Sequence, residues 1–257
     1  MCRLFGIAGT PPLPIQEALN AFYPLCTNGC VKKGMPPGHD DGWGISGFSG
    51  GRAVYFARRA EPASRSADDY RQAAERSAKS GAPLFIAHFR KASGSPPAIA
   101  NTHPFHHQDW IFAHNGTIFG AAASFPLISA EPQGETDSER FFLWLFEQMH
   151  TETDPTRTLV DVLKKVREEL VYTSLNFLMT DGARLWAYRD FGDKRLEKNE
   201  SVKDREEYYT LYLTPLASGV AVCSEPLAAL SAKWTPMNQR TLMVCTPQAP
   251  APQLIKI

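Results

Sequence analysis

The stretch from Trp43 to Arg59 reads WGISGFSGGRAVYFARR and predicts two antiparallel strands joined by a tight turn. Apolar and aromatic residues dominate its two halves, roughly residues 43–48 and 52–59. Between them lies Ser49-Gly50-Gly51. Because glycine tolerates the positive φ angles that tight turns require, this triplet is a strong hairpin signal. The segment therefore favours antiparallel sheet.

The same pattern recurs through the rest of the chain. Two more hairpins are predicted, SLNFLMTDGARLWAYR at 174–189 and YYTLYLTP with SGVAVCSE at 208–225. Further strands are expected at 3–9, 83–90, 109–115 and 241–247, the last of which closes the sheet region, and residues 92–108 are expected to form a loop. Helices are expected at about 15–22, 67–80 and 155–170, and from Thr136 onward.

The order of these elements decides the fold class. Strands cluster in hairpins and two long helices lie together in the middle of the chain, unlike the regular strand-helix alternation of parallel α/β proteins. The class is therefore α+β with segregated helices. One sheet covered on one face and two stacked sheets with helices outside both satisfy the pattern.

Length and composition indicate one packed domain spanning residues 1–257. The chain has 43% hydrophobic residues and 27 Lys+Arg against 27 Asp+Glu. Zero formal charge argues against nucleic acid as a partner. The longest apolar run, Phe141 to Phe146, is too short to cross a membrane, which takes about 20 residues. With no signal-peptide stretch at the N-terminus, we expect a cytoplasmic protein with no membrane partner.

The cysteines do not indicate a disulfide framework. Their number is odd, and they are scattered: Cys2, Cys26, Cys30, Cys223 and Cys245. The Cys26 and Cys30 spacing could begin a zinc site, but no second pair completes it. A metal-dependent hydrolase remains an alternative because the chain has seven histidines, among them His39 beside Asp40, although no helical His pair fixes two ligands.

Cys2 differs from the other cysteines because it follows the initiator Met. Cysteine is small enough that we expect Met1 to be removed. The new terminus would carry an α-amine of pKa about 7.7–8.0 beside a thiol of pKa about 8.5. The amine would then serve as a general base for a thiol nucleophile on the same residue. The alternative is a cysteine that frays with the chain end.

Six short motifs, the first of which contains Cys2, occur along the chain between residues 2 and 139. They are CRLFGIAG at 2–9, GHDDGWGI at 38–45, AHFRKAS at 87–93, NTHPF at 101–105, HNG at 114–116 and ETDSE at 135–139. The set resembles the class II glutamine amidotransferases, and SEPL at 224–227 followed by Trp234 resembles their stand-alone glutaminase-type members. The resemblance implies the N-terminal-nucleophile (Ntn) hydrolase fold, a four-layer αββα sandwich, and so favours two stacked sheets.

The resemblance also implies a role for each matched side chain. Cys2 would be the nucleophile, and Asn115 and Gly116 would form the oxyanion hole. Arg90 would bind the substrate α-carboxylate, a task that suits a planar guanidinium, and Asp137 would bind the α-ammonium. Each residue has a plainer explanation: Asn-Gly is a common turn, Arg90 ends a strand, and an acidic residue favours the first turn of a helix.

One position departs from the family pattern. Members fused to synthase domains carry an Arg-Gly pair before the glycine-rich turn, whereas this chain has Gly38-His39. His39 is similar to what stand-alone members carry, and we assign it to substrate binding, next to the Cys2 amine or the substrate.

The implied reaction needs no metal and no cofactor. The Cys2 thiolate would attack the γ-carbonyl of glutamine or a γ-glutamyl amide, forming a γ-glutamyl thioester and releasing ammonia or an amine. Two alternatives stay open for this small-molecule substrate: a glutaminase that feeds ammonia to a separate synthase subunit, and a γ-glutamyl peptide hydrolase with no acceptor synthase. A non-catalytic binding module is a third.

Overall fold

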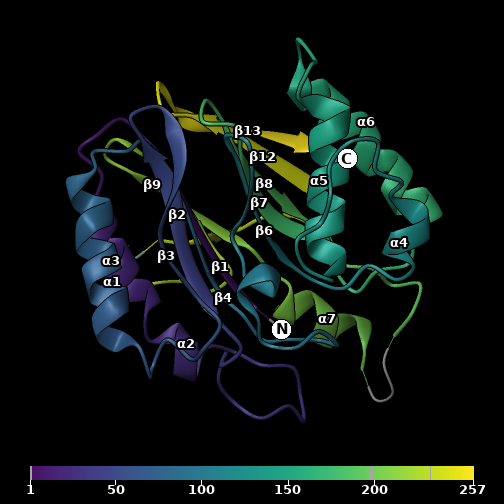
Figure 1. Ribbon diagram of the computed structural model, residues 1–257, viewed down its shortest axis with the longest axis horizontal. Coiled ribbons are helices and arrows are strands. Elements are labelled where there is room, and N and C mark those ends of the chain that lie inside the picture. The colour runs from purple at the N-terminus through teal and green to yellow at the C-terminus, as the bar shows by residue number, and fades with distance from the viewer. Residues whose placement is uncertain (1, 197–199, 232) are drawn as a thin grey trace.

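Two antiparallel sheets stacked face to face form the centre of the computed structural model, which describes residues 2–196, 200–231 and 233–257 (Figure 1). In spatial order, the seven-stranded sheet contains β11 (Thr235–Pro236), β9 (Tyr212–Leu216), β10 (Gly219–Cys223), β1 (Arg3–Gly9), β4 (Leu84–Phe89), β2 (Trp43–Ser49) and β3 (Arg52–Arg59). The six-stranded sheet contains β13 (Ala249–Lys256), β12 (Thr241–Thr246), β8 (Leu185–Arg189), β7 (Asn176–Thr180), β6 (Trp110–Asn115) and β5 (Phe105–His107).

Helices cover the outer face of each sheet (Figure 1). Beside the seven-stranded sheet lie α1 (Ile15–Phe22) and α3 (Ala67–Lys79), and beside the six-stranded sheet lie α5 (Asp137–Met149) and α6 (Pro155–Glu169). Shorter helices are α2 (Leu25–Asn28), α4 (Ala121–Ser124), α7 (Val202–Tyr208) and a 3-10 turn at Ile99–Asn101. The layers confirm the predicted αββα sandwich and, of the two sheet arrangements left open, select stacked sheets.

Apolar packing holds the four layers together. Phe22 of α1 stacks on Phe89 of β4 with ring centroids 4.5 Å apart, and Phe142 of α5 stacks on Phe112 of β6 at 5.2 Å. Between the sheets, a side chain at Gly6 would contact Leu178 of β7 at 3.0 Å. Small residues on β1 therefore allow the two sheets to approach closely.

The hairpin at 43–59 forms as predicted. Strands β2 and β3 pair from Trp43↔Arg59 to Ser49↔Arg52, and Gly50 and Gly51 have φ values of 57° and 80°. Both glycines therefore occupy the left-handed region that favours glycine. This hairpin forms one edge of the seven-stranded sheet.

Several elements differ from the sequence-based expectation. The predicted loop at 92–108 contains the 3-10 turn and strand β5, and helix α7 occupies residues just before the third hairpin. The sheet does not close at 247, because β13 pairs with β12 along the edge of the six-stranded sheet. Proline is tolerated at such an edge, where one side of the strand makes no ladder hydrogen bonds, so the prolines in APAPQLIK do not break the strand.

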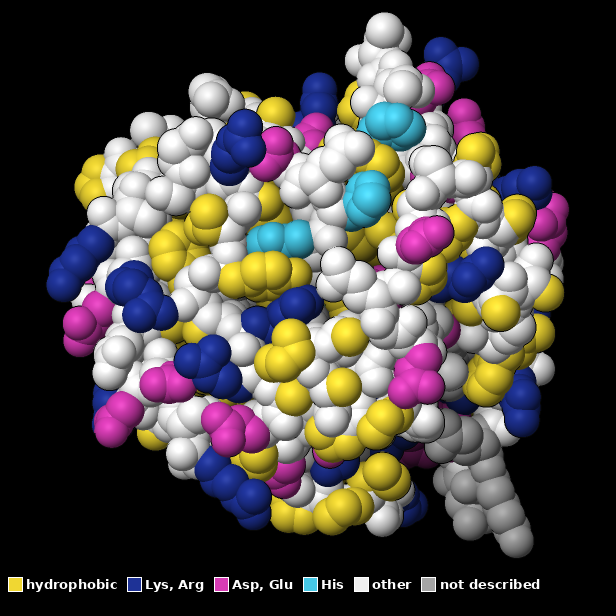
Figure 2. All heavy atoms as spheres, viewed as in Figure 1, with side chains coloured by type: hydrophobic (Ala, Val, Ile, Leu, Met, Phe, Trp, Pro, Cys, Tyr) yellow, Lys and Arg dark blue, Asp and Glu magenta, His cyan; other side chains and the backbone are white. Residues whose placement is uncertain are grey.

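Charged side chains of both signs are interspersed on the face in Figure 2, in keeping with the zero formal charge. Across the described ranges of the chain, none of the helices combines the length and apolarity that crossing a bilayer demands.

Candidate active site

The start of β1 and the ends of β4 and β6 meet at one end of the sandwich. Arg3 pairs with Phe89, which brings Cys2 beside Arg90, and Asn115 is the last residue of β6 in the facing sheet. A small cavity of about 30 Å³ lies there. Its lining includes five of the six predicted site residues: Cys2, Arg90, Asn115, Gly116 and Asp137. Residues from five of the six motifs, far apart in the sequence, thus line one cavity.

Cys2 lines this cavity and is 8% exposed. The backbone N–H of Lys91 donates to Sγ at 3.4 Å, and the thiol donates to the Lys91 carbonyl at 3.6 Å. Burial raises the pKa of the Cys2 thiol, and the Lys91 hydrogen bond opposes that effect. The thiol therefore needs a base if it is to act as a nucleophile near neutral pH.

Asn115 connects directly to Cys2. The backbone nitrogen of Cys2 donates to Asn115 Oδ1 at 3.1 Å. The Asn115 side chain is 1% exposed, and its Nδ2 lacks a hydrogen-bond partner among the described residues. A buried donor without a partner is costly, so an oxygen atom in this cavity would be bound strongly by it.

Gly116 follows with no room for a side chain. A Cβ at this position would lie 2.0 Å from the Ser174 carbonyl oxygen. Glycine is therefore required here by the close approach of the 174 backbone, independently of any turn. The same close approach fixes the Asn115-Gly116 peptide relative to Cys2.

Arg90 is 3% exposed, and backbone oxygens surround its guanidinium. Nη1 donates to the Asp41 and Pro96 carbonyls at 3.2 and 3.3 Å, and Nη2 donates to Ser95 O and Oγ at 3.0 and 2.7 Å. The side chain thus holds the segment 95–96 over the cavity. The cavity itself is small, about 30 Å³, and Ser95 is among the residues that line it.

The glycine-rich turn supports Arg90 from the other side. The Arg90 N–H donates to the Gly42 carbonyl at 2.7 Å, and Asp41 Oδ2 accepts from the Ala92 N–H at 2.8 Å. Gly42 has a φ of 138°, and a Cβ there would lie 2.8 Å from Thr102 Oγ1. The turn therefore needs glycine for both conformation and space.

Asp137 is the first residue of α5, behind the N-cap Thr136. Thr136 Oγ1 accepts from the Glu139 N–H at 3.1 Å, which is why the helix begins here. Asp137 Oδ2 accepts from the Ile118 N–H at 2.6 Å. This hydrogen bond holds the carboxylate at the cavity wall.

His39 is the one predicted site residue, all six being described, that does not line this cavity. It is fully buried, and its Nε2 would lie 3.0 Å from a Cβ at Gly29. Burial, and next the charge of Arg3, lowers the pKa of His39 to about 3. The structure therefore has a buried, neutral imidazole close to Gly29 at this position.

Two further residues at the cavity were assigned no part in the thiol mechanism. Lys91 contacts the thiol through its backbone, and its Nζ donates to Pro36 O and Gly38 O at 2.8 and 2.7 Å. His103 is 4% exposed, lines the cavity and packs on His88 with ring centroids 4.3 Å apart. Both residues lie inside the quoted motifs AHFRKAS and NTHPF, but the Lys91 contact with the thiol is made by backbone atoms, which the residue type does not reveal.

In the part of the chain that the structure describes, no group of three or more His, Cys, Asp and Glu side chains is arranged to hold a metal ion.

Comparison with known proteins identifies the family. The family described as "Glutamine amidotransferases class-II" matches residues 1–248. An uncharacterised protein of Methanocaldococcus jannaschii is 30% identical over 204 residues, covering 76% of this chain and 52% of the relative. This chain thus spans about half the length of that relative.

Solved structures share the fold at low sequence identity. A glutamine aminotransferase class-II domain protein from Silicibacter pomeroyi is 19% identical with a TM-score of 0.61, covering 98% of each chain. Glutamine phosphoribosylpyrophosphate amidotransferase from B. subtilis is 15% identical with a TM-score of 0.67, covering 99% of this chain and 49% of that one. These likenesses support the Ntn amidotransferase architecture.

Proposed function

The chain belongs to the class II glutamine amidotransferases, and we propose that it cleaves the γ-amide bond of glutamine or of a γ-glutamyl amide with Cys2 as the nucleophile. The observation that carries the proposal is the Cys2–Asn115 pair. Asn115 Oδ1 accepts from the Cys2 nitrogen at 3.1 Å, while Nδ2 of the same side chain is buried without a partner among the described residues. One amide group can therefore orient the N-terminal residue and bind a developing oxyanion.

The reaction begins with proton transfer within Cys2. Met1, whose removal we expect, lies outside the described residues. After its removal, the nitrogen that donates to Asn115 is an α-amine, which accepts the thiol proton. The thiolate attacks the γ-carbon, a C–S bond forms, and the carbonyl oxygen becomes an oxyanion near Asn115 Nδ2 and the Gly116 N–H.

Collapse of this intermediate breaks the C–N bond. The Cys2 ammonium returns its proton to the leaving nitrogen, and ammonia or an amine departs. Water then hydrolyses the γ-glutamyl thioester, which yields glutamate and regenerates the thiol. These steps balance without a redox partner or a metal ion.

Arg90 and Asp137 would orient the amino-acid end of the substrate. The Arg90 guanidinium already donates to four oxygens, which a substrate carboxylate would replace in part. Asp137 offers a carboxylate at the cavity wall for the α-ammonium. Two charged anchors at fixed positions would present the γ-carbonyl to Cys2.

The identity of the released product distinguishes a glutaminase that supplies a synthase subunit from a γ-glutamyl peptide hydrolase. Released ammonia would serve a separate synthase subunit as acceptor, whereas an amine released from a γ-glutamyl peptide needs no acceptor. The γ-glutamyl half, which Arg90 and Asp137 would bind, is common to both substrates.

The test uses the purified chain and its Cys2→Ala variant. Intact mass determines whether Met1 is absent, and glutamate release is measured from glutamine and from γ-glutamyl dipeptides. We expect Met1 to be absent and release to depend on Cys2. Equal release by the Cys2→Ala variant, or a retained Met1 in active protein, would contradict the mechanism.

A further inference from the structure

The SEPL motif at 224–227 has no part in the reaction proposed above, yet it lies beside the start of β1. The motif follows β10 directly, and β10 pairs with β1 in the register Phe5↔Cys223. Because the two strands are antiparallel, the residues after Cys223 run alongside those that precede Phe5. The motif therefore meets the chain at Leu4 and Arg3, just after the nucleophile.

Ser224 bonds to both backbone groups of Leu4. The Ser224 N–H donates to the Leu4 carbonyl at 3.0 Å, and Ser224 Oγ accepts from the Leu4 N–H at 3.0 Å. Ser224 is buried, so water competes little for either bond. The second residue of β1 is therefore held by a side chain as well as by its pairing with β4.

Glu225 connects Arg3 to a third segment of the chain. Its Oε1 accepts from Arg3 Nη1 at 3.1 Å and from the Cys30 N–H at 2.7 Å. The Arg3 side chain is 1% exposed and that of Glu225 is 19% exposed. Removing one partner of a buried ion pair leaves an uncompensated charge, so this pair constrains the chain more than a surface pair would.

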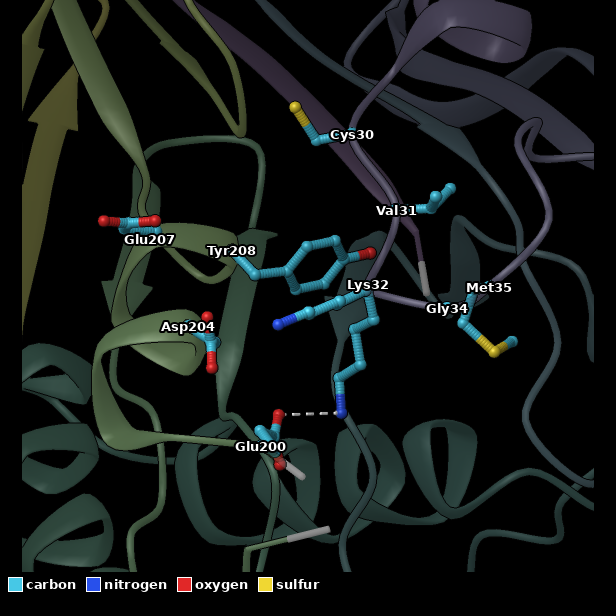
Figure 3. A pocket seen from close by; sticks show the side chains of 10 residues that line it. Cys30, Val31, Lys32, Gly34, Met35, Glu200, Asp204, Glu207 and Tyr208 are labelled. Carbon is cyan, nitrogen blue, oxygen red and sulfur yellow. Dashed lines mark ion pairs between the residues drawn. The ribbon is translucent and has the colours of Figure 1, made fainter. Parts of the chain in front are cut away.

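Tyr208 contacts the same guanidinium, which lies 4.7 Å from the centre of the Tyr208 ring. Tyr208 is the last residue of α7, and Figure 3 shows its ring extending toward residues 30–35. These two segments, together with Glu200, form the two walls of a large cavity of about 600 Å³. Arg3 is thus held between the SEPL motif and α7.

Trp234 fixes the shape of the motif. Its Nε1 donates to the Leu227 carbonyl at 3.1 Å, and the Leu230 N–H donates to the same oxygen at 2.9 Å. The Leu227 side chain is buried in the same apolar cluster as side chains of β1 and β10. The turn that ends the motif is therefore closed, and it presents Ser224 and Glu225 to β1.

The start of β1 needs such support because the proposed reaction uses a terminal residue. Chain ends fray unless they are tied down. Cys2 precedes β1, and it is held through its nitrogen on Asn115 and its thiol on the Lys91 backbone. Because Cys2 is joined to Arg3 by one peptide bond, movement of Arg3 would disturb both contacts.

We propose that the SEPL motif and Trp234 position the nucleophile, with Glu225 and Arg3 as positioning residues for Cys2. This inference rests on the proposed function. Neither positioning residue lines the Cys2 cavity, so neither is assigned a contact with substrate. By holding Arg3, the ion pair keeps the Cys2 nitrogen on Asn115 Oδ1 and the sulfur in the cavity. A small displacement of a reacting group is enough to lower a rate strongly.

Glu225→Ala removes the pair, and Glu225→Gln is the conservative variant because its amide oxygen can still accept both hydrogen bonds. We expect Glu225→Ala to lower kcat for glutamate release about tenfold, with KM changed less than about twofold, because the groups proposed to bind the amino-acid end of the substrate are untouched. Glu225→Gln should restore most of the loss. Glu207→Ala, which removes an exposed carboxylate of α7, is the matched control and should leave kcat unchanged.

Hydrogen-exchange mass spectrometry reports on the start of β1 without turnover. We expect Glu225→Ala to accelerate exchange about tenfold in the peptide that contains Leu4 and to leave β12 of the facing sheet unchanged. If Glu225→Ala is not recovered folded, Trp234→Phe provides the same comparison, because it keeps an aromatic ring and removes the donor to Leu227.

Faster exchange confined to the start of β1, together with the lower kcat, would support the positioning role. A wild-type chain that releases no glutamate would contradict the proposed function alone, and the exchange comparison would still decide whether the motif fixes β1. Unchanged exchange at Leu4, or exchange that rises equally in β12, would overturn the inference. A wild-type kcat in a variant whose β1 exchanges faster would overturn it as well.

Discussion

Asn115 has two polar atoms with two different environments. Its Oδ1 is engaged by the Cys2 nitrogen at 3.1 Å, whereas its Nδ2 is buried without a described partner. A carboxylate at this position keeps the acceptor and loses the donor. The two tasks can therefore be separated by substitution.

We expect Asn115→Asp and Asn115→Ala to lower kcat for glutamate release about 10²- to 10³-fold, the usual effect of removing an oxyanion donor. KM should change little, because the donor acts on charge that develops in the transition state. Steady-state kinetics with glutamine measures both. Asn20→Ala, which removes an exposed amide on α1, is the control. An unchanged kcat in Asn115→Asp would remove Nδ2 from the mechanism.

Individual site residues differ in whether the sequence alone could predict them. The family resemblance, with the chemistry of each matched side chain, indicated Cys2, Arg90, Asn115 and Asp137, and these line one cavity. Lys91 escaped because it contacts the thiol through backbone atoms, which any residue type would supply. The large cavity escaped as well, because its two walls come from segments about 170 residues apart that only the tertiary fold brings together.

At the scale of elements, α5 begins in the candidate active site, whereas α6 begins at the surface. Thr136 caps α5 and lines the Cys2 cavity, and Asp154 caps α6 by accepting from the Arg157 N–H at 3.1 Å. Both caps satisfy a backbone donor at a helix N-terminus. The two helices differ in their first turns, because that of α5 contains the site residue Asp137 directly after Thr136.

We expect Thr136→Ala and Asp154→Ala each to lower the free energy of unfolding by about 1 kcal/mol. Only Thr136→Ala should also raise KM for glutamine, because loosening the first turn of α5 moves the Asp137 carboxylate. Urea unfolding and steady-state kinetics on the same preparations provide the comparison. If both variants lost stability equally and neither changed KM, Asp137 would not be positioned by this cap.

Helices and strands were predicted correctly where the apolar pattern and the turn residues indicated the same element. The hairpin at 43–59 has both alternating apolar strands and a glycine turn, and it formed. Strand β13 was not predicted, because the sheet region was expected to close at 247. The position of β13 at the sheet edge, where proline is acceptable, is not visible in the sequence. Helix α7 has a capping box, Ser201 with Asp204, but only seven residues, too short for an apolar periodicity to appear.

At the scale of the whole molecule, stacking the sheets buries several histidines in neutral form. The pKa values of His39 and His106 are both lowered to about 3, mainly by burial, and those of His88 and His103 are lowered well below 6.5. In the unfolded chain these groups bind protons near pH 6.5. As pH falls below that value, the unfolded state gains protons that the folded state does not, so stability falls until the folded pKa is reached.

We expect the free energy of unfolding to decrease steadily from about pH 6.5 toward pH 4, with each such histidine contributing up to about 1.4 kcal/mol per pH unit. His106→Gln should flatten this slope by that amount, because glutamine can replace the 2.9 Å hydrogen bond to Ser46 without titrating. Urea unfolding at a series of pH values measures the slope.

His150→Gln, at an exposed position, is the matched control and should leave the slope unaltered. Burial raises the pKa of Asp190, which works in the opposite direction at low pH, but this effect is common to all three proteins and cancels in their comparison. Parallel slopes for wild type and His106→Gln would mean that His106 is solvated enough in the folded protein to titrate as it does in the unfolded chain.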